Sequence, residues 1–276
     1  MCTLMKKTIL TIAIIAWTII GSWAAGTGTN KTFTSRLYGF AEQFEWEEHL
    51  DGRQLVKESG PLFGAGGELG FQIANPVWLE GRGELFLGDV DYDGSIMTKK
   101  GEFIPYKSTT KYVGIKIEGD AALRLPVSHT VYIKPYAGLG IRVWRRTLDT
   151  KTSDTQIGKY GYIEDWVTAY GRLGCEGGIT ISGASELFAR IEWRLPIDNS
   201  MTVNLTNAGG PSDVDLEPGE RASFYAEGGI NATPITVSVF IETLEFSQSS
   251  LDAKYQGALQ PESESTMIGA KLGLTF

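Results

Sequence analysis

The sequence of 276 residues predicts an all-β protein, a transmembrane antiparallel up-and-down β-barrel of about ten strands that follows a cleaved signal peptide. Three observations predict this class. Apolar and polar residues alternate along many runs of the chain, as they do in strands with one face in lipid and one in the barrel interior. Long polar connections alternate with tight turns. The last run, 267–276, keeps the alternation up to its terminal aromatic residue.

The N-terminal residues predict a secretory signal peptide. Lys6 and Lys7 precede an apolar run, and a small-x-small cleavage site ends at Ala24. The apolar run is shorter than the roughly 20 residues that a transmembrane helix needs. We therefore expect residues 1–24 to be removed and residues 25–276 to form a single barrel domain.

The composition agrees with a barrel and excludes several other classes. The mean hydropathy of −0.09 does not exclude a membrane protein, because only half of each barrel strand is apolar. The net charge of −8 argues against a nucleic-acid partner. Removal of the signal peptide leaves Cys175 as the single cysteine, so no internal disulfide is possible and Cys175 is expected to face lipid. No cofactor is expected.

The alternating runs define the predicted strands and their connections. We place strands at about 33–46, 61–74, 77–89, 109–125, 130–146, 164–181, 186–197, 221–232 and 235–247, and a tenth at the end of the chain. Tight turns at 75–76 and 233–234 alternate with long loops at about 47–60, 90–108 and 197–220. An even strand number with short turns at one end of the barrel is typical of outer-membrane barrels. Both termini then lie at the short-turn end.

Charged residues share one parity in most strands, and large apolar residues share the other. A charge that faces lipid at mid-bilayer costs roughly 2–4 kcal/mol, so the charged parity must face the interior. The predicted lumen network, to which no catalytic role is given, consists of Glu68, Glu80, Arg82, Glu84, Lys116, Glu118, Arg142, Arg172, Glu176, Arg190, Glu192, Arg194, Glu227 and Lys271. A soluble β-sandwich would put these charges in water, but the chain lacks the apolar volume for a core between two sheets.

Two sets of aromatic residues need separate treatment. In the first strand, Tyr38, Phe40, Phe44 and Trp46 share a parity with charged residues, so its faces stay unassigned. The tryptophans in or near the other strands are expected to be interfacial rings that face the lipid headgroups. They are Trp78, Trp144, Trp166 and Trp193.

The predicted interior is nearly balanced in charge. Paired charges are tolerated in a confined interior whereas unpaired ones are costly. Wide aqueous pores also need about 16–18 strands. We therefore expect a narrow barrel that is closed or conducts poorly, with a structural or surface-interaction role carried by its external loops. A porin-like small-solute channel is the first alternative.

A hydrolase at the outer rim is the second alternative, and enzyme activity is not expected. The chain has two histidines. His129 lies in a short turn, and His49 lies in the first predicted external loop without a recognisable flanking motif. No catalytic residue is assigned.

One acidic stretch could bind a divalent cation weakly at the external rim. Asp89, Asp91, Asp93 and Gly94 resemble the first half of an EF-hand calcium loop. The acid needed at the twelfth position is replaced by Lys100. The simpler reading is a strand that runs past the membrane into an Asp-Gly turn.

The final alternation that ends in Phe276 resembles the closing strand of Gram-negative outer-membrane β-barrel proteins. At the level of pattern the resemblance covers the whole mature chain and is nearest to the small OmpA and opacity-type barrels. The chain also has the size of an omptin but lacks omptin motifs. The resemblance implies an outer-membrane location, contact with lipid and lipopolysaccharide, and recognition of Phe276 as an assembly signal by the barrel-assembly machinery. A monomer is expected.

Overall fold

A computed structural model describes residues 33–97, 103–149, 161–183, 185–208, 212–251 and 258–276. The predicted signal peptide, residues 1–24, lies outside the described residues, as does Lys100.

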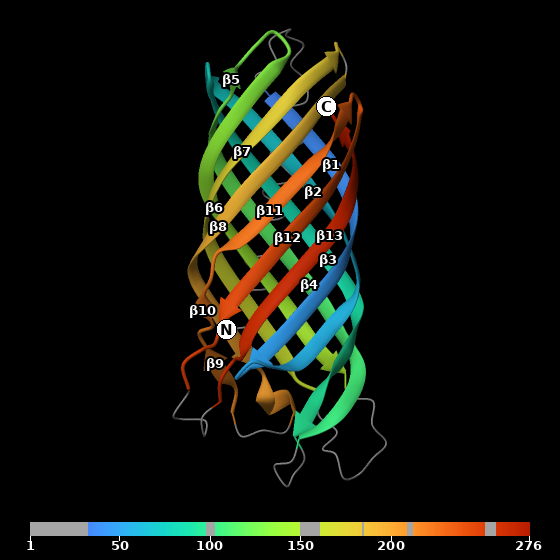
Figure 1. Cartoon of the computed structure of the whole chain (residues 1–276), viewed down its shortest axis with the longest axis vertical. Coiled ribbons are helices and arrows are strands. Elements are labelled where there is room, and N and C mark those ends of the chain that lie inside the picture. Colours follow the sequence, from blue (N-terminus) through green and yellow to red (C-terminus); the bar gives the residue numbers. More distant parts are fainter. Residues whose placement is uncertain (1–32, 98–102, 150–160, 184, 209–211, 252–257) are drawn as a thin grey trace. The chain divides into compact units, whose positions relative to one another are not determined.

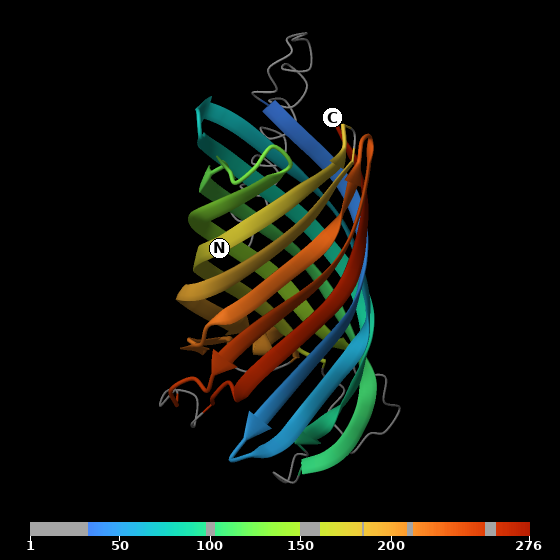
Figure 2. The same cartoon turned by 45° about the horizontal axis from the view of Figure 1, so that its top comes forward.

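Ten long strands form the wall of the barrel (Figure 1). They are β1 (Phe33–Leu50), β2 (Arg53–Ala74), β3 (Val77–Met97), β4 (Phe103–Leu123), β6 (Val131–Asp149), β7 (Ile163–Ser182), β8 (Ser185–Val203), β11 (Ser223–Ala232), β12 (Ile235–Ser247) and β13 (Glu262–Thr275). The remaining elements are β5 (Leu125–Pro126), the 3-10 helix η1 (Leu205–Ala208), β9 (Val214–Leu216) and β10 (Gly219–Glu220). Each long strand pairs antiparallel with the next, and β13 pairs with β1, so the sheet closes on itself without a free edge (Figure 2).

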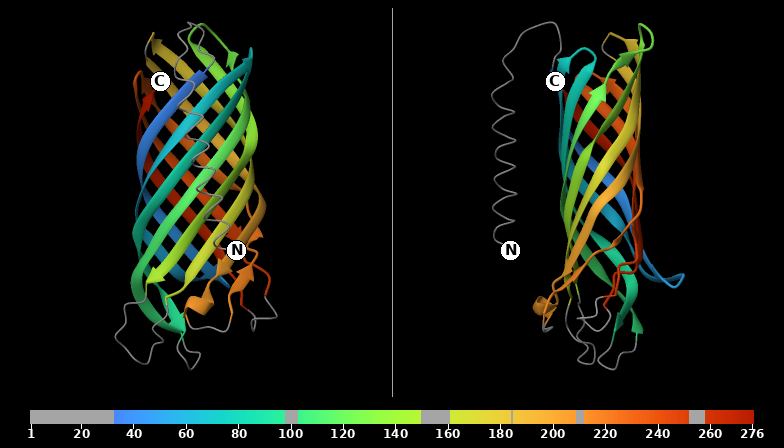
Figure 3. Two further views of the ribbon diagram at one scale, coloured as in Figure 1. Left: turned by 180° about the vertical axis from the view of Figure 1, so that it is seen from behind. Right: turned by 90° about the vertical axis from the view of Figure 1, so that its left-hand side faces the viewer.

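The two ends of the barrel differ (Figure 3). At the turn end, short connections follow β2, β7 and β11, and the backbone N–H of Phe276 donates to the carbonyl of Ser35 at 2.9 Å. The longer connections lie at the opposite, loop end. In outer-membrane barrels the end with short turns faces the periplasm and the end with long loops faces outward. We use these two names for the ends below.

The strands are longer at the loop end than the sequence predicted. The expected loop at 47–60 is wrong, because β1 continues to Leu50 and a two-residue turn, Asp51–Gly52, leads directly into β2. Both turn residues have positive φ, 51° and 74°, as in a tight hairpin. Most of the predicted loop at 90–108 also belongs to β3 and β4.

The outer wall explains why these extensions look like loops in the sequence. Large apolar residues such as Leu37, Phe63 and Leu139 are more than half exposed and form the lipid-facing belt. About 9–11 residues suffice for a strand to cross a membrane, whereas β2 has 22. Beyond the belt the outward side chains become charged, as at Glu45 and Lys57, which lie 3.0 Å apart. The alternation of apolar and polar residues therefore ends where the outward side chains become charged, although the strand itself continues.

Among the described residues, no helix is long and apolar enough to cross a membrane.

The connection between β8 and β11 is folded against the barrel. β9 pairs with β8 and β10 pairs with β12, so the prediction of a free loop over 197–220 is wrong for these residues. Val214 and Leu216 are buried in the main core cluster, because their alternation leaves one apolar face that needs cover. Thr206 donates from its backbone N–H and its hydroxyl to Asp213, and these hydrogen bonds lower the pKa of Asp213.

The inner wall carries most of the aromatic residues. In β1, Tyr38, Phe40, Phe44 and Trp46 all point inward, which settles the faces of the first strand. The prediction of interfacial rings is wrong for three tryptophans, which are buried: Trp78, Trp144 and Trp166. Trp193 is half exposed on the outer wall. A barrel of this size has an interior that side chains can fill, and large rings fill it.

Candidate functional site: the barrel interior

The structure places every residue of the predicted lumen network on the inner wall. All are buried except Glu68 and Glu80, which are partly exposed at the turn end. The inward set also contains charged residues that the prediction did not include. These are Arg36, Glu42, Glu48, Glu58, Arg146, Glu164 and Glu186. Four further charged residues share the charged parity of their predicted strands, were expected to face inward and do so: Asp120, Arg124, Lys134 and Glu242.

Glu118 is the carboxylate around which three arginines gather in the barrel interior. Its carboxylate accepts from Arg82 Nε at 2.5 Å, and Arg194 and Arg172 lie 3.2 and 3.6 Å away. The hydroxyl of Tyr170 donates to the same carboxylate at 2.7 Å. A buried carboxylate is tolerated only when charge and hydrogen bonds compensate for the lost water. Glu118 meets both conditions.

Glu242 joins opposite walls of the barrel. It lies 2.9 Å from Lys116 Nζ, 2.5 Å from Arg142 and 2.6 Å from Arg194. In the closed ring of ten strands, β4 and β12 are five positions apart and therefore directly opposite. The Lys116–Glu242 contact thus spans the full width of the lumen.

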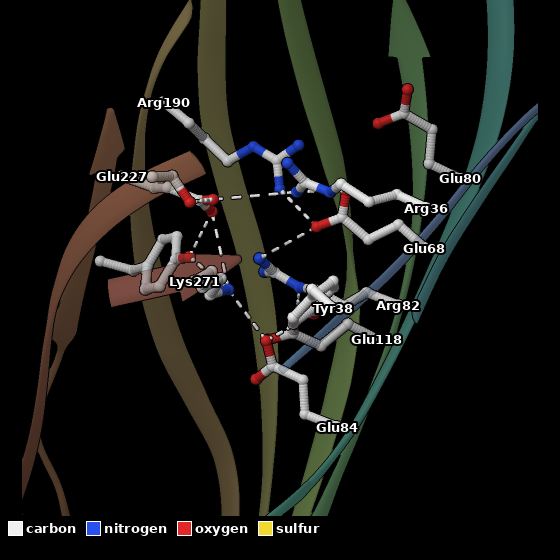
Figure 4. A network of polar contacts seen from close by, with 12 residues as sticks. Arg36, Tyr38, Glu68, Glu80, Arg82, Glu84, Glu118, Arg190, Glu227 and Lys271 are labelled. Carbon is white, nitrogen blue, oxygen red and sulfur yellow. Dashed lines mark hydrogen bonds and ion pairs between the residues drawn. The ribbon is translucent and has the colours of Figure 1, made fainter. Parts of the chain in front are cut away.

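Glu84 and Lys271 make a second link across the interior (Figure 4). Lys271 Nζ lies 2.9 Å from a carboxylate oxygen of Glu84 and 3.7 Å from one of Glu227. Lys116 Nζ lies 2.6 Å from the other oxygen of Glu84. Lys271 comes from the closing strand, so this contact ties β13 to β3 and β4.

Three tyrosines cross a glycine on the neighbouring strand to reach a glutamate on the strand after it. The register aligns Tyr38–Gly66–Glu84, Tyr170–Gly140–Glu118 and Tyr136–Gly174–Glu192. The hydroxyls donate to the carboxylates at 2.6, 2.7 and 2.9 Å. A Cβ on the intervening glycine would lie 2.4–2.8 Å from the tyrosine ring, so only glycine admits the crossing. We call this arrangement the Tyr–Gly–Glu bridge.

Towards the loop end the lumen is filled by aromatic rings. Trp144 and Trp166 stack with their centroids 5.2 Å apart, and Trp46 meets Trp166 edge-on at 5.5 Å. Phe246 contacts this group from β12, 5.3 Å from Trp166. The indole N–H groups of Trp46 and Trp166 donate to glutamates at 3.0 Å, so the rings bury no unpaired donor there.

A buried cation with three carboxylates lies beside these rings. Arg146 contacts Glu58 at 2.6 Å, Glu164 at 2.9 Å and Glu48 at 3.3 Å. Glu58 also accepts hydrogen bonds from Thr110 and from a tyrosine hydroxyl on β4. All four charged side chains are nearly inaccessible to water. The ion pairs of Arg146 with these three glutamates connect β6 to β1, β2 and β7 at the loop end, beyond the lipid-facing belt.

The sequence could have revealed this group through parity alone. Glu48 shares the parity of Trp46, and Arg146 shares that of Arg142, which was assigned to the interior. Both lay at or beyond the predicted strand ends, where the apolar face gives way to charge. The error in the strand ends concealed the site.

The acidic stretch of β3 lies on the outer wall. Asp89, Asp91 and Asp93 are exposed, and β3 continues through Gly94 to Met97 as a strand and not as a loop. Alternate residues of a strand are roughly 6–7 Å apart, so these carboxylates line the strand and do not converge. Asp93 already pairs with Lys107 at 2.6 Å. Weak cation binding here stays a prediction, and it would have to use an extended strand.

The two histidines face away from the lumen. His129 is exposed at the turn end. His49 lies on the outer wall at the loop end, 3.7 Å from Glu47, and Glu264 brings a third ligand atom within 4.8 Å. Lys57 Nζ also contacts Glu47 at 2.8 Å and neutralises part of this group.

Cavities in the interior are unequal in size. One cavity has a volume of about 160 Å³ and lies at the turn end, between Arg36, Trp78, Arg82 and Arg190. A second, beside Glu42, and a third, beside Asn199, each have about 10 Å³. That volume is about the minimum that holds one water molecule.

No family model and no curated protein matches the sequence. Solved structures do match. The outer-membrane protease OmpT from Escherichia coli aligns with a TM-score of 0.59 and 12% identity, over 92% of this chain and 99% of that chain. OprG from Pseudomonas aeruginosa aligns with a TM-score of 0.36 and 12% identity, over 88% and 95% of the two chains.

At this identity the likeness to OmpT shows the fold alone. The chain has the fold of the Gram-negative outer-membrane β-barrels, closed by ten long strands. The predicted fold, an antiparallel up-and-down barrel of about ten strands, is confirmed, and it is consistent with the predicted outer-membrane location.

Proposed function

We propose that this protein is a closed outer-membrane barrel that acts through its external surface and not by conducting solutes. The wall-to-wall contact of Lys116 with Glu242 is the observation that supports the proposal most strongly. The aromatic group around Trp166 fills the lumen further towards the loop end. Envelope lipid, lipopolysaccharide and extracellular molecules are the proposed partners, because the strands extend beyond the apolar belt and carry charge there.

Conductance tests the proposal directly. We expect refolded protein in planar lipid bilayers to give no sustained conductance steps. Beyond the 160 Å³ cavity at the turn end, charged and aromatic side chains fill the lumen, and the cavities beside Glu42 and Asn199 each have about the volume of one water molecule. A refolded sixteen-stranded porin, with its wide pore, is the positive control. Heat-shifted gel mobility verifies that the inserted protein is folded. Reproducible steps from the folded protein would establish the small-solute channel instead.

The hydrolase alternative depends on His49, the histidine at the loop end. It faces outward and contacts Glu47, so a reaction there would take place on the outer wall. We expect His49→Ala to leave hydrolysis of ester and peptide reporter substrates at the level of the native protein. Activity in the native protein that disappears in His49→Ala, with His129→Ala as the control, would favour the hydrolase.

A further inference from the structure

The outer wall at the loop end carries a row of three glutamates across the seam at which the barrel closes. The register places Glu47 of β1 opposite Glu264 of β13, and Glu264 opposite Glu245 of β12. All three face outward, where Glu264 is exposed and the other two are partly exposed. Like charges directly opposite one another on neighbouring strands are destabilising. The row therefore favours the presence of a cation.

Basic side chains neutralise the two ends of this row but not its middle. Lys57 Nζ lies 2.8 Å from Glu47 Oε1, and Arg221 lies 3.2 Å from Glu245. Within the part of the chain that the structure describes, Glu264 has no ion pair with a lysine or an arginine. Both basic residues are also shared with further outward glutamates, which are Glu45 and Glu262. Negative charge is consequently in excess here, and it is greatest at Glu264.

His49 brings a ring nitrogen to the middle of the row. It follows Glu47 by two residues on β1, so the two side chains share the outward face. His49 Nε2 lies 3.7 Å from Glu47 Oε2, whereas Lys57 contacts the other oxygen, Oε1. One ligand atom from each of Glu47, His49 and Glu264 lies within 4.8 Å of the other two. The side chains of His49 and Glu47 are 30% and 21% exposed, so an ion from solution can reach them.

The spacing and the kinds of ligand atom define the cation. Two ligands of a tetrahedral zinc ion, each about 2.1 Å from the metal, are roughly 3.4 Å apart. The 3.7 Å between His49 and Glu47 is close to that value, and the exposed Glu264 can rotate towards both. Calcium and magnesium prefer oxygen ligands only, whereas an imidazole nitrogen suits zinc, copper and nickel. We propose that Glu47, His49 and Glu264 bind a divalent transition-metal ion of the zinc type.

A metal ion in this position would join the first and last strands of the barrel. Glu47 and His49 belong to β1 and Glu264 to β13, the two strands whose pairing closes the sheet. A ligand that binds only the folded state stabilises it in proportion to its occupancy. The site lies on the outer wall and does not depend on a closed lumen, so conductance and metal binding are decided by separate measurements.

Isothermal titration calorimetry on the refolded mature protein, in detergent micelles and without a histidine tag, tests the site with Zn²⁺ and Ca²⁺. We expect Zn²⁺ to bind at least about tenfold more tightly than Ca²⁺, because one of the three ligands is a nitrogen. Saturating Zn²⁺ should also raise the urea concentration at the midpoint of unfolding. No heat beyond that of empty micelles, equal affinity for the two ions, or an unchanged midpoint would overturn the proposal.

Two variants connect the zinc signal to these residues. His49→Ala and Glu264→Gln should each weaken Zn²⁺ binding at least about tenfold, since even the loss of a group that only orients a metal ligand costs about 10–100-fold. Heat-shifted gel mobility verifies that both variants fold. The controls are His129→Ala, at the turn end, and Asp93→Asn, in the acidic stretch of β3, and both should bind Zn²⁺ like the native protein. Unchanged affinity in His49→Ala, or an equal loss in either control, would exclude the site.

Discussion

Replacing Arg146 by leucine is expected to destabilise the folded barrel by about 3–5 kcal/mol, the usual range when one partner of a buried ion pair is removed. The side chain is 2% exposed and lies within 3.3 Å of three carboxylates. Leucine leaves Glu48, Glu58 and Glu164 close together without a cation. Their mutual repulsion and lost solvation then oppose folding of the loop end.

The neighbouring residue supplies a matched control. Arg145 has the same side chain on the same strand, but it faces outward, is 37% exposed and pairs with Asp165 at 2.7 Å. The bidentate pair, with a second contact at 2.9 Å, is partly exposed and screened by water, so Arg145→Leu should cost about 1 kcal/mol, clearly less than Arg146→Leu. Urea titrations of both variants in lipid vesicles give the two free energies of unfolding. Equal losses in the two variants would contradict the assignment of Arg146 to a buried network.

The alternation of charged and apolar residues correctly predicted the inward face of a strand in the part that crosses the membrane, because outward residues there must be apolar. Arg142 and Lys116 were assigned in this way, and the structure places both inside. The same signal failed for Glu58, because outside the membrane both faces of β2 carry polar residues. Trp144 was misplaced although it shares the parity of Arg142, because tryptophan is so often an interfacial residue.

Contacts between strands could not be predicted from one sequence. Tyr170, Gly140 and Glu118 form a bridge because β7, β6 and β4 are aligned in one particular register. A shift of two residues between strands would keep every side chain on its face and destroy the bridge. Register depends on the stagger with which the whole barrel closes, so it is a property of all ten strands together.

The inner wall of the barrel is occupied mainly by charged side chains that pair with one another. His49 and His129, the two histidines of this chain, both face away from the inner wall. The inward charges here are mostly paired with one another. Side chains committed to such mutual contacts hold the strands of the barrel together, and the stability of the fold depends on them.

The Tyr–Gly–Glu bridge predicts a second large effect. Gly140→Val should destabilise the barrel by about 3 kcal/mol, because a Cβ there would lie 2.4 Å from the ring of Tyr170. Overpacking alone costs about 1–3 kcal/mol. Displacement of the ring also breaks its hydrogen bond to Glu118, a bond to a charged group worth about 1.5–3 kcal/mol. The two losses overlap, since a ring that moves away relieves the clash.

Gly171→Val is the control for this effect. Gly171 faces outward, and the nearest atom to its Cβ is the carbonyl oxygen of Leu195 at 3.8 Å. Valine there meets lipid and should change the free energy of unfolding by about 0.5 kcal/mol or less. A comparable loss in both variants would mean that β-branched residues, and not the bridge, cause the effect.

A double-mutant cycle with Tyr170→Phe separates the clash from the lost hydrogen bond. In the native background, Tyr170→Phe should cost about 1.5–3 kcal/mol, because it removes a hydroxyl that donates to a buried carboxylate. In the Gly140→Val background the hydroxyl no longer reaches Glu118, so the same replacement should cost almost nothing. The difference between the two values is the coupling energy of the bridge. Simple additivity would show that Tyr170 keeps its contact with Glu118 despite the valine, and that glycine is not required for the crossing.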